Sequence, residues 1–270
     1  MQDLDIFLKT KRPGDNLPGE AASLRWLAEA EPDGGVHIAR VFRVDETELA
    51  IERVHETMPT AASARAFGRA LAHTHAAGAP WWGCPPDDWV GPSWVGHSHT
   101  PLVLDETQAA PNWGTLYADS RIEVFAERLS DRGDIDAAQR AVFDRVCDRL
   151  RAGEFDVVQP ALVREAGHTV ARNHGDLWGG NVMYDGGPTG VTLIDPYAQG
   201  GHAETDLASL AVFGLPLRAD VVAAYDEVSP LADGWRERVG LHELAMIIMH
   251  AYKYAGGYIE AAVTLARRYC

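Results

Sequence analysis

Short apolar runs alternate with one amphipathic segment in the first fifty-six residues. DIFLK (5–9) predicts a strand, and VHIARVFRV (36–44) and LAIERV (49–54) predict two more because they are rich in β-branched residues. PGEAASLRWLAEA (18–30) spaces its alanines and leucines so that they form a rough apolar face, which predicts a helix. The order strand, helix, strand, strand indicates a small antiparallel sheet that carries one helix.

From residue 57 onward the pattern is mostly helical. The predicted helices cover residues 61–78, 117–129, 135–150, 204–213, 235–253 and 258–268. Gly78 is expected to end the first of them, and Asp134 to cap the third. A stretch rich in Pro, Trp and Gly, at 80–112, predicts loop. We therefore expect two parts, a sheet-containing lobe over residues 1–56 and a larger helical lobe over 57–270.

NVMYDGGPTGVTLID, at residues 181–195, interrupts the helical part with two apolar runs around a Gly/Pro turn, which predicts a β-hairpin. Asn181 begins the first strand and Asp195 ends the second, so the two side chains should converge. Asp176 lies just upstream in a loop. Carboxylate and amide oxygens are suitable ligands for Mg²⁺. A carboxylate that does not bind metal could orient a hydroxyl and accept its proton.

Composition narrows the functional classes. The formal net charge of −15 argues against a nucleic-acid binder. The three cysteines, Cys84, Cys147 and Cys270, are far apart, which argues against a disulfide framework and indicates a cytoplasmic protein. No apolar run approaches the ~20 residues that a membrane span requires. The pairs His73/His75 and His97/His99 invite a zinc interpretation, but residues i and i+2 of the helix predicted over the first pair do not share a face.

HGDLWGGN, at residues 174–181, resembles the catalytic loop of the kinase-like small-molecule phosphotransferases, and IDP (194–196) resembles their metal-binding motif. The Trp-Gly-Gly inside the loop resembles the fructosamine kinase family, also known as fructosamine-3-kinases or ketosamine kinases. FLK, GEAASLRWL, LAIERV, ETDLASLAVFG and the C-terminal segment also resemble that family, so the resemblance covers nearly the whole chain.

The resemblance implies a two-lobed, protein-kinase-like α+β fold with ATP and Mg²⁺ between the lobes. It implies ATP-binding roles for Lys9, Glu20 and Glu52, with Glu20 pairing with Lys9, and metal binding by Asn181 and Asp195. Asp176 would be the catalytic base, and Trp178 and His250 would bind the acceptor. The implied reaction phosphorylates the C3 hydroxyl of a ketosamine, either a small molecule or a glycated lysine, and so reverses glycation. The oligomeric state does not follow from it.

One family feature has no counterpart in the printed sequence. The family has a glycine-containing hairpin that covers the phosphates before the lysine strand, whereas Met1 here lies eight residues before Lys9. The N-terminal lobe is therefore expected to be truncated before that strand. The hairpin either lies upstream of Met1 or is absent, in which case ATP would bind weakly.

Alternatives remain open at this stage. Lys9 could be an exposed strand lysine, Glu52 a solvated strand residue, Trp178 a core anchor and His250 a structural helix histidine. Two other functions compete with ketosamine phosphorylation. One is a kinase for another alcohol, such as an aminoglycoside or choline, and the other is a non-catalytic nucleotide- or ligand-binding protein on a kinase scaffold.

Overall fold

The N-terminal strands form a small sheet under one helix. The computed structural model describes residues 5–95 and 98–270. Its three-stranded antiparallel sheet has the order β1-β4-β3, with β1 at Ile6–Thr10, β4 at Glu48–Glu52 and β3 at Val41–Val44. The helix α1 (Leu17–Ala28) packs against this sheet, and Asn16 caps it by accepting a hydrogen bond from the Gly19 amide. The predicted antiparallel sheet that carries one helix is thereby confirmed.

The expected strand over 36–44 is in fact two strands that belong to different sheets. Its first half, β2 (His37–Ile38), pairs in parallel with β9 (Val191–Leu193), which pairs in antiparallel fashion with β8 (Val182–Tyr184). The Ala39 amide extends this pairing by donating to the Leu193 carbonyl at 3.0 Å. Ile38 is almost fully buried in the core cluster that includes the hairpin. The chain therefore pairs first with the hairpin, at β2, and joins the N-terminal sheet only at β3.

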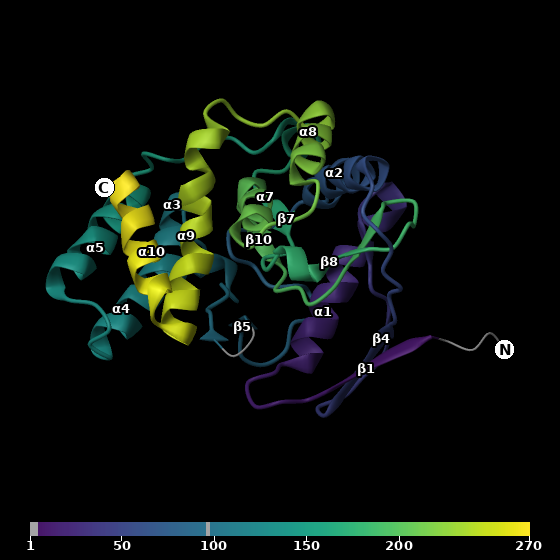
Figure 1. The fold of residues 1–270 in the computed structure, drawn as a ribbon, viewed down its shortest axis with the longest axis horizontal. Helices are drawn as coiled ribbons and strands as arrows, with labels where there is room; N and C mark the ends of the chain where they lie inside the picture. The colour runs from purple at the N-terminus through teal and green to yellow at the C-terminus, as the bar shows by residue number, and fades with distance from the viewer. Residues whose placement is uncertain (1–4, 96–97) are drawn as a thin grey trace.

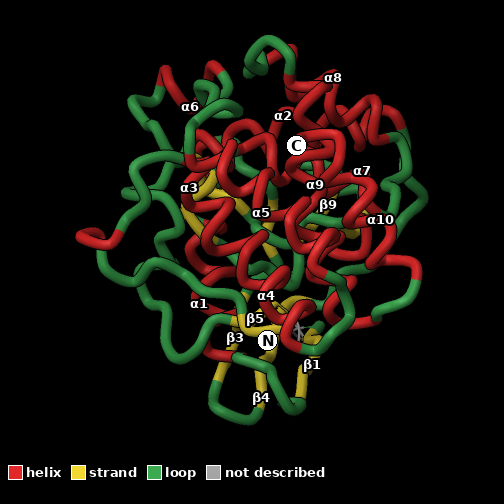
Figure 2. Tube along the Cα trace, turned by 90° about the vertical axis from the view of Figure 1, so that its left-hand side faces the viewer, coloured by secondary structure: helices red, strands yellow, loops and turns green. Residues whose placement is uncertain are grey.

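The rest of the chain is largely helical, and its helices lie on the side of the molecule away from β1 and β4 (Figure 1). They are α2 (Ala61–Ala76), α3 (Trp113–Tyr117), α4 (Glu123–Asp131), α5 (Ala137–Arg151), α6 (Ala161–Glu165), α7 (Ala203–Val212), α8 (Arg218–Val228), α9 (Trp235–Tyr254) and α10 (Gly257–Ala266). The described residues also contain short strand pairs: the predicted β8–β9 hairpin, β5 (Trp94–Val95) with β6 (Ser98–His99), and β7 (Ala171–Asn173) with β10 (Gln199–Gly201). Figure 2 shows the N-terminal strands gathered below the helices.

Most helix boundaries lie within two residues of the prediction, and two starts differ for a physical reason. The helix expected at 117–129 begins at Trp113, because the Asn112 side chain caps it, and a π-helical turn at Ala118–Ile122 joins α3 to α4. The helix α5 is capped by Asp136 rather than Asp134. Asp136 and Gln139 exchange hydrogen bonds between side chain and backbone, a capping box that Asp134 lies too early in the chain to form. The short helices α6 and α8 were not expected.

The buried apolar residues form two large clusters. One joins α1, the β2–β9–β8 sheet, α2 and α8, and the other joins α3, α4, α5, α9 and α10. The loop at residues 174–181 lies between them, with Leu177 in the first cluster and Trp178 packed on the second. Among the residues that the structure describes, no helix combines the length and apolarity that a bilayer span demands.

Candidate active site

Lys9 and Glu20 form an ion pair on the N-terminal side of the site. The Lys9 ammonium lies 2.8 Å from both carboxylate oxygens of Glu20 and 2.8 Å from Asp195 Oδ1. The sheet presents Lys9 from β1, α1 presents Glu20, and the end of the hairpin presents Asp195. The predicted Lys9–Glu20 pair is therefore present, and the same lysine also connects the sheet to the hairpin.

The charges of this triad influence one another. Burial alone would lower the pKa of Lys9, but Glu20 and Asp195 raise it, so Lys9 remains an ammonium at neutral pH. Burial raises the pKa of Glu20, and the Lys9 ammonium opposes that effect. Asp195 is the most exposed of the three, with 45% of its side chain accessible, and is therefore the carboxylate most readily offered to a cation.

The hairpin brings Asn181 and Asp195 together as expected. Asn181 Nδ2 donates to the Asp176 carbonyl at 2.7 Å and approaches the Asp195 carbonyl at 3.4 Å. This contact engages the amide nitrogen and leaves the amide oxygen available to a cation. Asp195 has a φ of 53°, a left-handed conformation that Asp tolerates better than most residues and that is common at functional sites. The donor set of one carboxylate and one amide oxygen fits a hard cation such as Mg²⁺.

A buried carboxyl group, Asp206 on α7, holds the catalytic loop in place. It accepts hydrogen bonds from the backbone amides of His174, at 2.7 Å, and Gly175, at 3.0 Å, and it lies 3.2 Å from His75 Nε2. His174 is also buried, and its Nε2 lies 3.0 Å from the Ile194 carbonyl of the hairpin. Sequence reasoning missed Asp206. The helix carries two acidic residues in its first turn, Glu204 and Asp206, and the sequence alone does not show which of them faces the loop.

Asp176 is partly buried, and Lys253 is a cation near its carboxyl group. Burial raises its pKa to about 6, and Lys253 and the Asn181 amide oppose the shift. The carboxyl group is therefore mostly ionised at neutral pH, yet basic enough to take up a proton. Lys253, on α9, is a second residue that the sequence prediction missed, because nothing in the local pattern of that helix distinguishes it.

Trp178 lies across its own loop and faces the cavity. A Cβ on Gly180 would come within 2.2 Å of Trp178 Cη2, so only glycine leaves room for the indole there. A Cβ on Gly179 would meet the Gly214 carbonyl oxygen at 2.4 Å. The indole packs edge-on against Phe213, with ring centroids 5.7 Å apart. Each glycine is therefore required for a different steric reason: Gly179 because of the Gly214 carbonyl, and Gly180 because of the Trp178 indole.

His250 belongs to the same aromatic wall. Its ring lies 4.9 Å from Phe213 and 5.5 Å from both Tyr254 and Tyr258. His250 Nδ1 donates to the Met246 carbonyl one turn earlier, at 2.8 Å, which leaves Nε2 as the free acceptor. Burial lowers the pKa of His250, so the ring is neutral at pH 7. Phe213 separates His250 from Trp178, and both line the same cavity, a position compatible with the acceptor-binding role that the sequence predicts.

The side chain of Glu52 contacts other residues of the N-terminal part. Its Oε2 lies 3.1 Å from His37 Nε2 and accepts a hydrogen bond from the Arg40 amide at 3.3 Å. The residue lies at the end of β4, beside a cavity that Leu8, Met183 and Asp195 also line. Any contact of Glu52 with a nucleotide would therefore be made by its backbone.

One cavity of about 570 Å³ joins most of these groups. Its lining includes the predicted residues Lys9, Glu20, Asp176, Trp178, Asn181, Asp195 and His250, together with Lys253, Phe213, Tyr254 and Tyr258. Of the predicted site residues, Glu52 alone is absent from this lining, and it lines the adjoining cavity instead.

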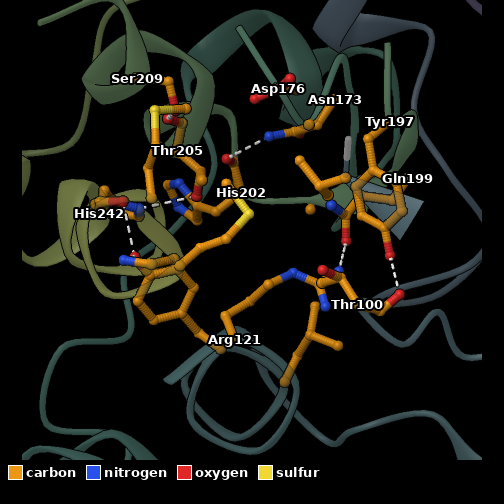
Figure 3. A pocket seen from close by; sticks show the side chains of 18 of the residues that line it. Thr100, Arg121, Asn173, Asp176, Tyr197, Gln199, His202, Thr205, Ser209 and His242 are labelled. Carbon is orange, nitrogen blue, oxygen red and sulfur yellow. Dashed lines mark hydrogen bonds between the residues drawn. The ribbon is translucent and has the colours of Figure 1, made fainter. Parts of the chain in front are cut away.

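A second, smaller cavity of about 70 Å³ has a mainly apolar lining with several polar side chains (Figure 3). Asp176 and Asn173 line it together with two buried histidines, His202 and His242. These histidines approach Glu204 closely enough to suggest a metal site. However, His202 Nδ1 accepts a hydrogen bond from the Glu204 amide, which leaves the proton of the neutral ring on Nε2, the atom that would have to bind the metal.

The ion pair of Glu204 is a second argument against a bound metal ion. Burial raises its pKa, but His242 and Arg238 lower it to about 2. Arg238 donates to both carboxylate oxygens, at 2.9 and 2.6 Å, so the carboxylate is already paired with a guanidinium. This cluster is therefore a buried ion pair that joins α7 to α9.

The two histidine pairs of the sequence have different positions. His75 lies 2.9 Å from the Tyr225 hydroxyl as well as near Asp206, so its ring is part of the buried scaffold. His73 lies beside Gly34 instead. His97 lies outside the described residues, and His99 is in β6.

Comparisons with known proteins agree with this geometry. The family model described as fructosamine kinase matches residues 2–270. An Enterococcus faecium protein named "Probable ketoamine kinase" is 25% identical over 240 residues, which are 85% of this chain and 78% of that protein.

Solved structures extend the comparison to the fold. The structure of a Thermobifida fusca protein named "putative fructosamine-3-kinase" superposes with a TM-score of 0.82 at 34% identity, over 97% of this chain and 84% of that one. The ADP-bound aminoglycoside phosphotransferase APH(2'')-Ib shares the fold, with a TM-score of 0.60 at 10% identity over 98% of this chain and 88% of that one. The predicted two-lobed, kinase-like α+β fold is thereby confirmed.

Proposed function

The chain belongs to the fructosamine kinase family, as its sequence predicts, and on that premise we propose that it transfers the γ-phosphoryl group of ATP to the C3 hydroxyl of a ketosamine. One observation carries the proposal. A single cavity joins the Lys9–Glu20 pair, the Asn181–Asp195 pair, the Asp176 carboxyl group and the Trp178 indole. Phosphoryl transfer requires these components: a cation for the phosphates, oxygen ligands for a metal, a base and a surface for the acceptor.

ATP would bind with its phosphates at Lys9. The ammonium, oriented by Glu20, would contact the α- and β-phosphates, and the backbone near Glu52 would contact the adenine. Asn181 and Asp195 would hold Mg²⁺, which neutralises phosphate charge during transfer. Asp195 is held by Lys9 at 2.8 Å, so binding of a metal would require these two groups to separate or to share the carboxylate.

Asp176 would act on the acceptor. Its carboxylate would accept a hydrogen bond from the C3 hydroxyl, orient the oxygen toward the γ-phosphorus and take up the proton as the oxygen–phosphorus bond forms. A pKa of about 6 suits this task, because the group is ionised at pH 7 without being a weak base. Asp206 accepts hydrogen bonds from the backbone amides of His174 and Gly175, so Asp176 would be positioned before any substrate binds.

The aromatic wall supports a ketosamine as the acceptor. The Trp178 indole offers a flat apolar face to the sugar or to the carbon chain of its amine, and His250 Nε2 offers an acceptor for a sugar hydroxyl or a protonated amine. The carrier of the sugar would be a small amine or a lysine side chain of a glycated protein. Because all three cysteines are free thiols, a reducing cytoplasm suits the protein.

A substrate panel tests this function. Purified protein is incubated with ATP and Mg²⁺ and with a fructosamine, a glycated lysine peptide, a free ketose, an aminoglycoside or choline, and ADP release is measured. We expect turnover with the ketosamines and at least ~10-fold lower kcat/KM with the other alcohols. Preference for an aminoglycoside or for choline would replace the proposed acceptor, and no ATP turnover with any alcohol would favour a binding protein.

A further inference from the structure

The catalytic loop itself lacks a positive charge. Between Asp176 and Asn181 the chain reads Leu-Trp-Gly-Gly, so no side chain there can bind the moving phosphoryl group as a cation. Phosphoryl transfer depends on cations and hydrogen-bond donors aimed at that group. Lys9 is already held by two carboxylates, each at 2.8 Å. A second cation beside Asp176 would therefore have to come from another element.

Lys253 is a cation in that position. It lies near the end of α9 and lines the same cavity as Asp176 and Trp178. Within the described residues its ammonium makes no ion pair shorter than 4.0 Å, and its hydrogen bond to the Val95 carbonyl is long, at 3.5 Å. Burial lowers the pKa of Lys253, and the Asp176 charge opposes this effect. The ammonium is therefore partly desolvated, close to the base and weakly bound to protein.

The lysine content of the chain adds an independent observation. The chain carries 24 cationic residues, and only Lys9, Lys11 and Lys253 among them are lysines. Two of these three lysines line the proposed active-site cavity. Arginine provides nearly all the other cationic side chains of the chain. An ammonium is a compact charge with three rotatable donors, whereas a guanidinium is a larger planar fork. The use of lysine at these two places suggests that a compact donor is needed there.

We propose that Lys253 is a catalytic residue of the phosphoryl transfer, whose ammonium binds an oxygen of the γ-phosphoryl group as it moves toward the acceptor held by Asp176. The proposal rests on the proposed function. The bond from the acceptor oxygen to the γ-phosphorus forms while the bond from that phosphorus to the β–γ bridging oxygen breaks. The acceptor proton passes to the Asp176 carboxylate, and the electron pair of the broken bond leaves with ADP. Lys253 keeps its proton throughout and also favours the ionised form of Asp176.

Removal of the ammonium should affect the transition state more than the ground state. Lys253→Met should lower kcat by about 10²-fold, the usual loss for one charge-stabilising donor, with little change in KM for ATP. Lys253→Arg should recover part of that loss.

A binding measurement avoids dependence on the acceptor. ADP with Mg²⁺ and aluminium fluoride imitates the planar phosphoryl group, so its affinity reports contacts made only in transfer. We expect Lys253→Met to weaken this complex by at least ~10-fold while the affinity for ADP and Mg²⁺ alone stays within about twofold. Arg236→Met is the matched control, because it removes an exposed cation from the same helix, about 25 Å away by the helical rise.

The outcomes separate this proposal from the proposed function. A wild type that phosphorylates no ketosamine defeats the function, yet the aluminium fluoride affinity and the rate of ATP hydrolysis by water still test Lys253. Unchanged affinity for the aluminium fluoride complex in Lys253→Met would overturn the proposal. An effect confined to a higher KM for fructosamines that carry a carboxylate would also overturn it, because Lys253 would then bind the acceptor. If Lys253→Met unfolds, Lys253→Gln serves for the same measurements.

Discussion

Asp176 and Lys9 line the same cavity, but their backbones have different support. The catalytic loop rests on Asp206, which is fully buried and accepts the amides of His174 and Gly175. The strand β1 is at the edge of its sheet, bonded to β4 alone, and exposes 45% of Phe7. The geometry of Asp176 is therefore set by the fold, whereas that of Lys9 depends on its ion pairs with Glu20 and Asp195.

The largest loss of turnover is expected from substitution of Asp195, which contacts Lys9 of the sheet and lies at the end of the hairpin. Asp195→Ala removes the exposed carboxylate of the proposed metal site and one partner of Lys9, so we expect turnover with ATP and Mg²⁺ to fall by about 10³-fold or more, some 4 kcal/mol. Asn181→Ala should act in the same direction but less severely, since it removes a neutral oxygen. Titration of ATP with and without Mg²⁺ measures both. Wild-type Mg²⁺ dependence in Asp195→Ala would show that the hairpin does not form the metal site.

The contrast in backbone support can be measured as stability. Asp206→Ala leaves two buried amides without an acceptor, so we expect a loss of about 3 kcal/mol in the free energy of unfolding. Phe7→Ala should lose less than about 1 kcal/mol, because nearly half of that side chain is already in water. Urea unfolding of both variants gives the comparison. Equal losses would mean that the edge strand is as strongly supported as the loop.

The role of the base is tested by a change that keeps its shape. Asp176→Asn retains the size of the side chain but cannot accept the proton, so we expect kcat to fall by roughly 10²-fold or more. Binding of ATP should survive, since Lys9 and Asp195 are untouched. Fluorescence titration of a nucleotide analogue and steady-state kinetics would be carried out on one preparation. Near-normal turnover would remove Asp176 from this role.

The smallest predicted effect concerns the acceptor wall. Trp178→Ala should raise KM for a fructosamine about tenfold, some 1.4 kcal/mol, with little change in KM for ATP. Gly180→Ala should reproduce the effect with the indole retained, because the new methyl would meet Trp178 Cη2 at 2.2 Å and displace it. If Trp178 is a core anchor, Trp178→Ala should instead cost ~3–5 kcal/mol of stability and lower the melting temperature first. A folded Trp178→Ala variant with unchanged KM for the fructosamine would contradict the wall.

The features that the sequence predicts correctly rest on local signals. The β8–β9 hairpin follows from two apolar runs around one turn, and its ends bring Asn181 and Asp195 together. The position of Lys9 opposite Glu20 follows from a strand and the next helix. In each case a short connection joins the two partners, so the local secondary structure alone brings them close together. The resemblance to a family supplied the roles of these residues, and their geometry is consistent with those roles.

The missed features depend on packing between distant segments. Asp206 and Lys253 reach the catalytic loop from α7 and α9, and no periodicity within those helices distinguishes them from other polar residues. The division of residues 36–44 into two strands depends on β9, which follows much later in the chain. The cap of α5 was misplaced by two residues because Asp134 and Asp136 are both acceptable caps, and only the reciprocal bonds with Gln139 decide between them.

The attachment of β2 to the hairpin has a mechanical consequence. Ile38 pairs with Leu193, and the Val36 amide donates to Thr74 of α2 at 2.9 Å, so the short segment between α1 and β3 is fastened to the helical part. That segment can serve as a fulcrum. A rotation of the β1-β4-β3 sheet about it would carry Lys9 toward or away from Asp195 while Ile38 stayed in place. The cavity would then open and close by rotation of the sheet about a buried, fixed segment.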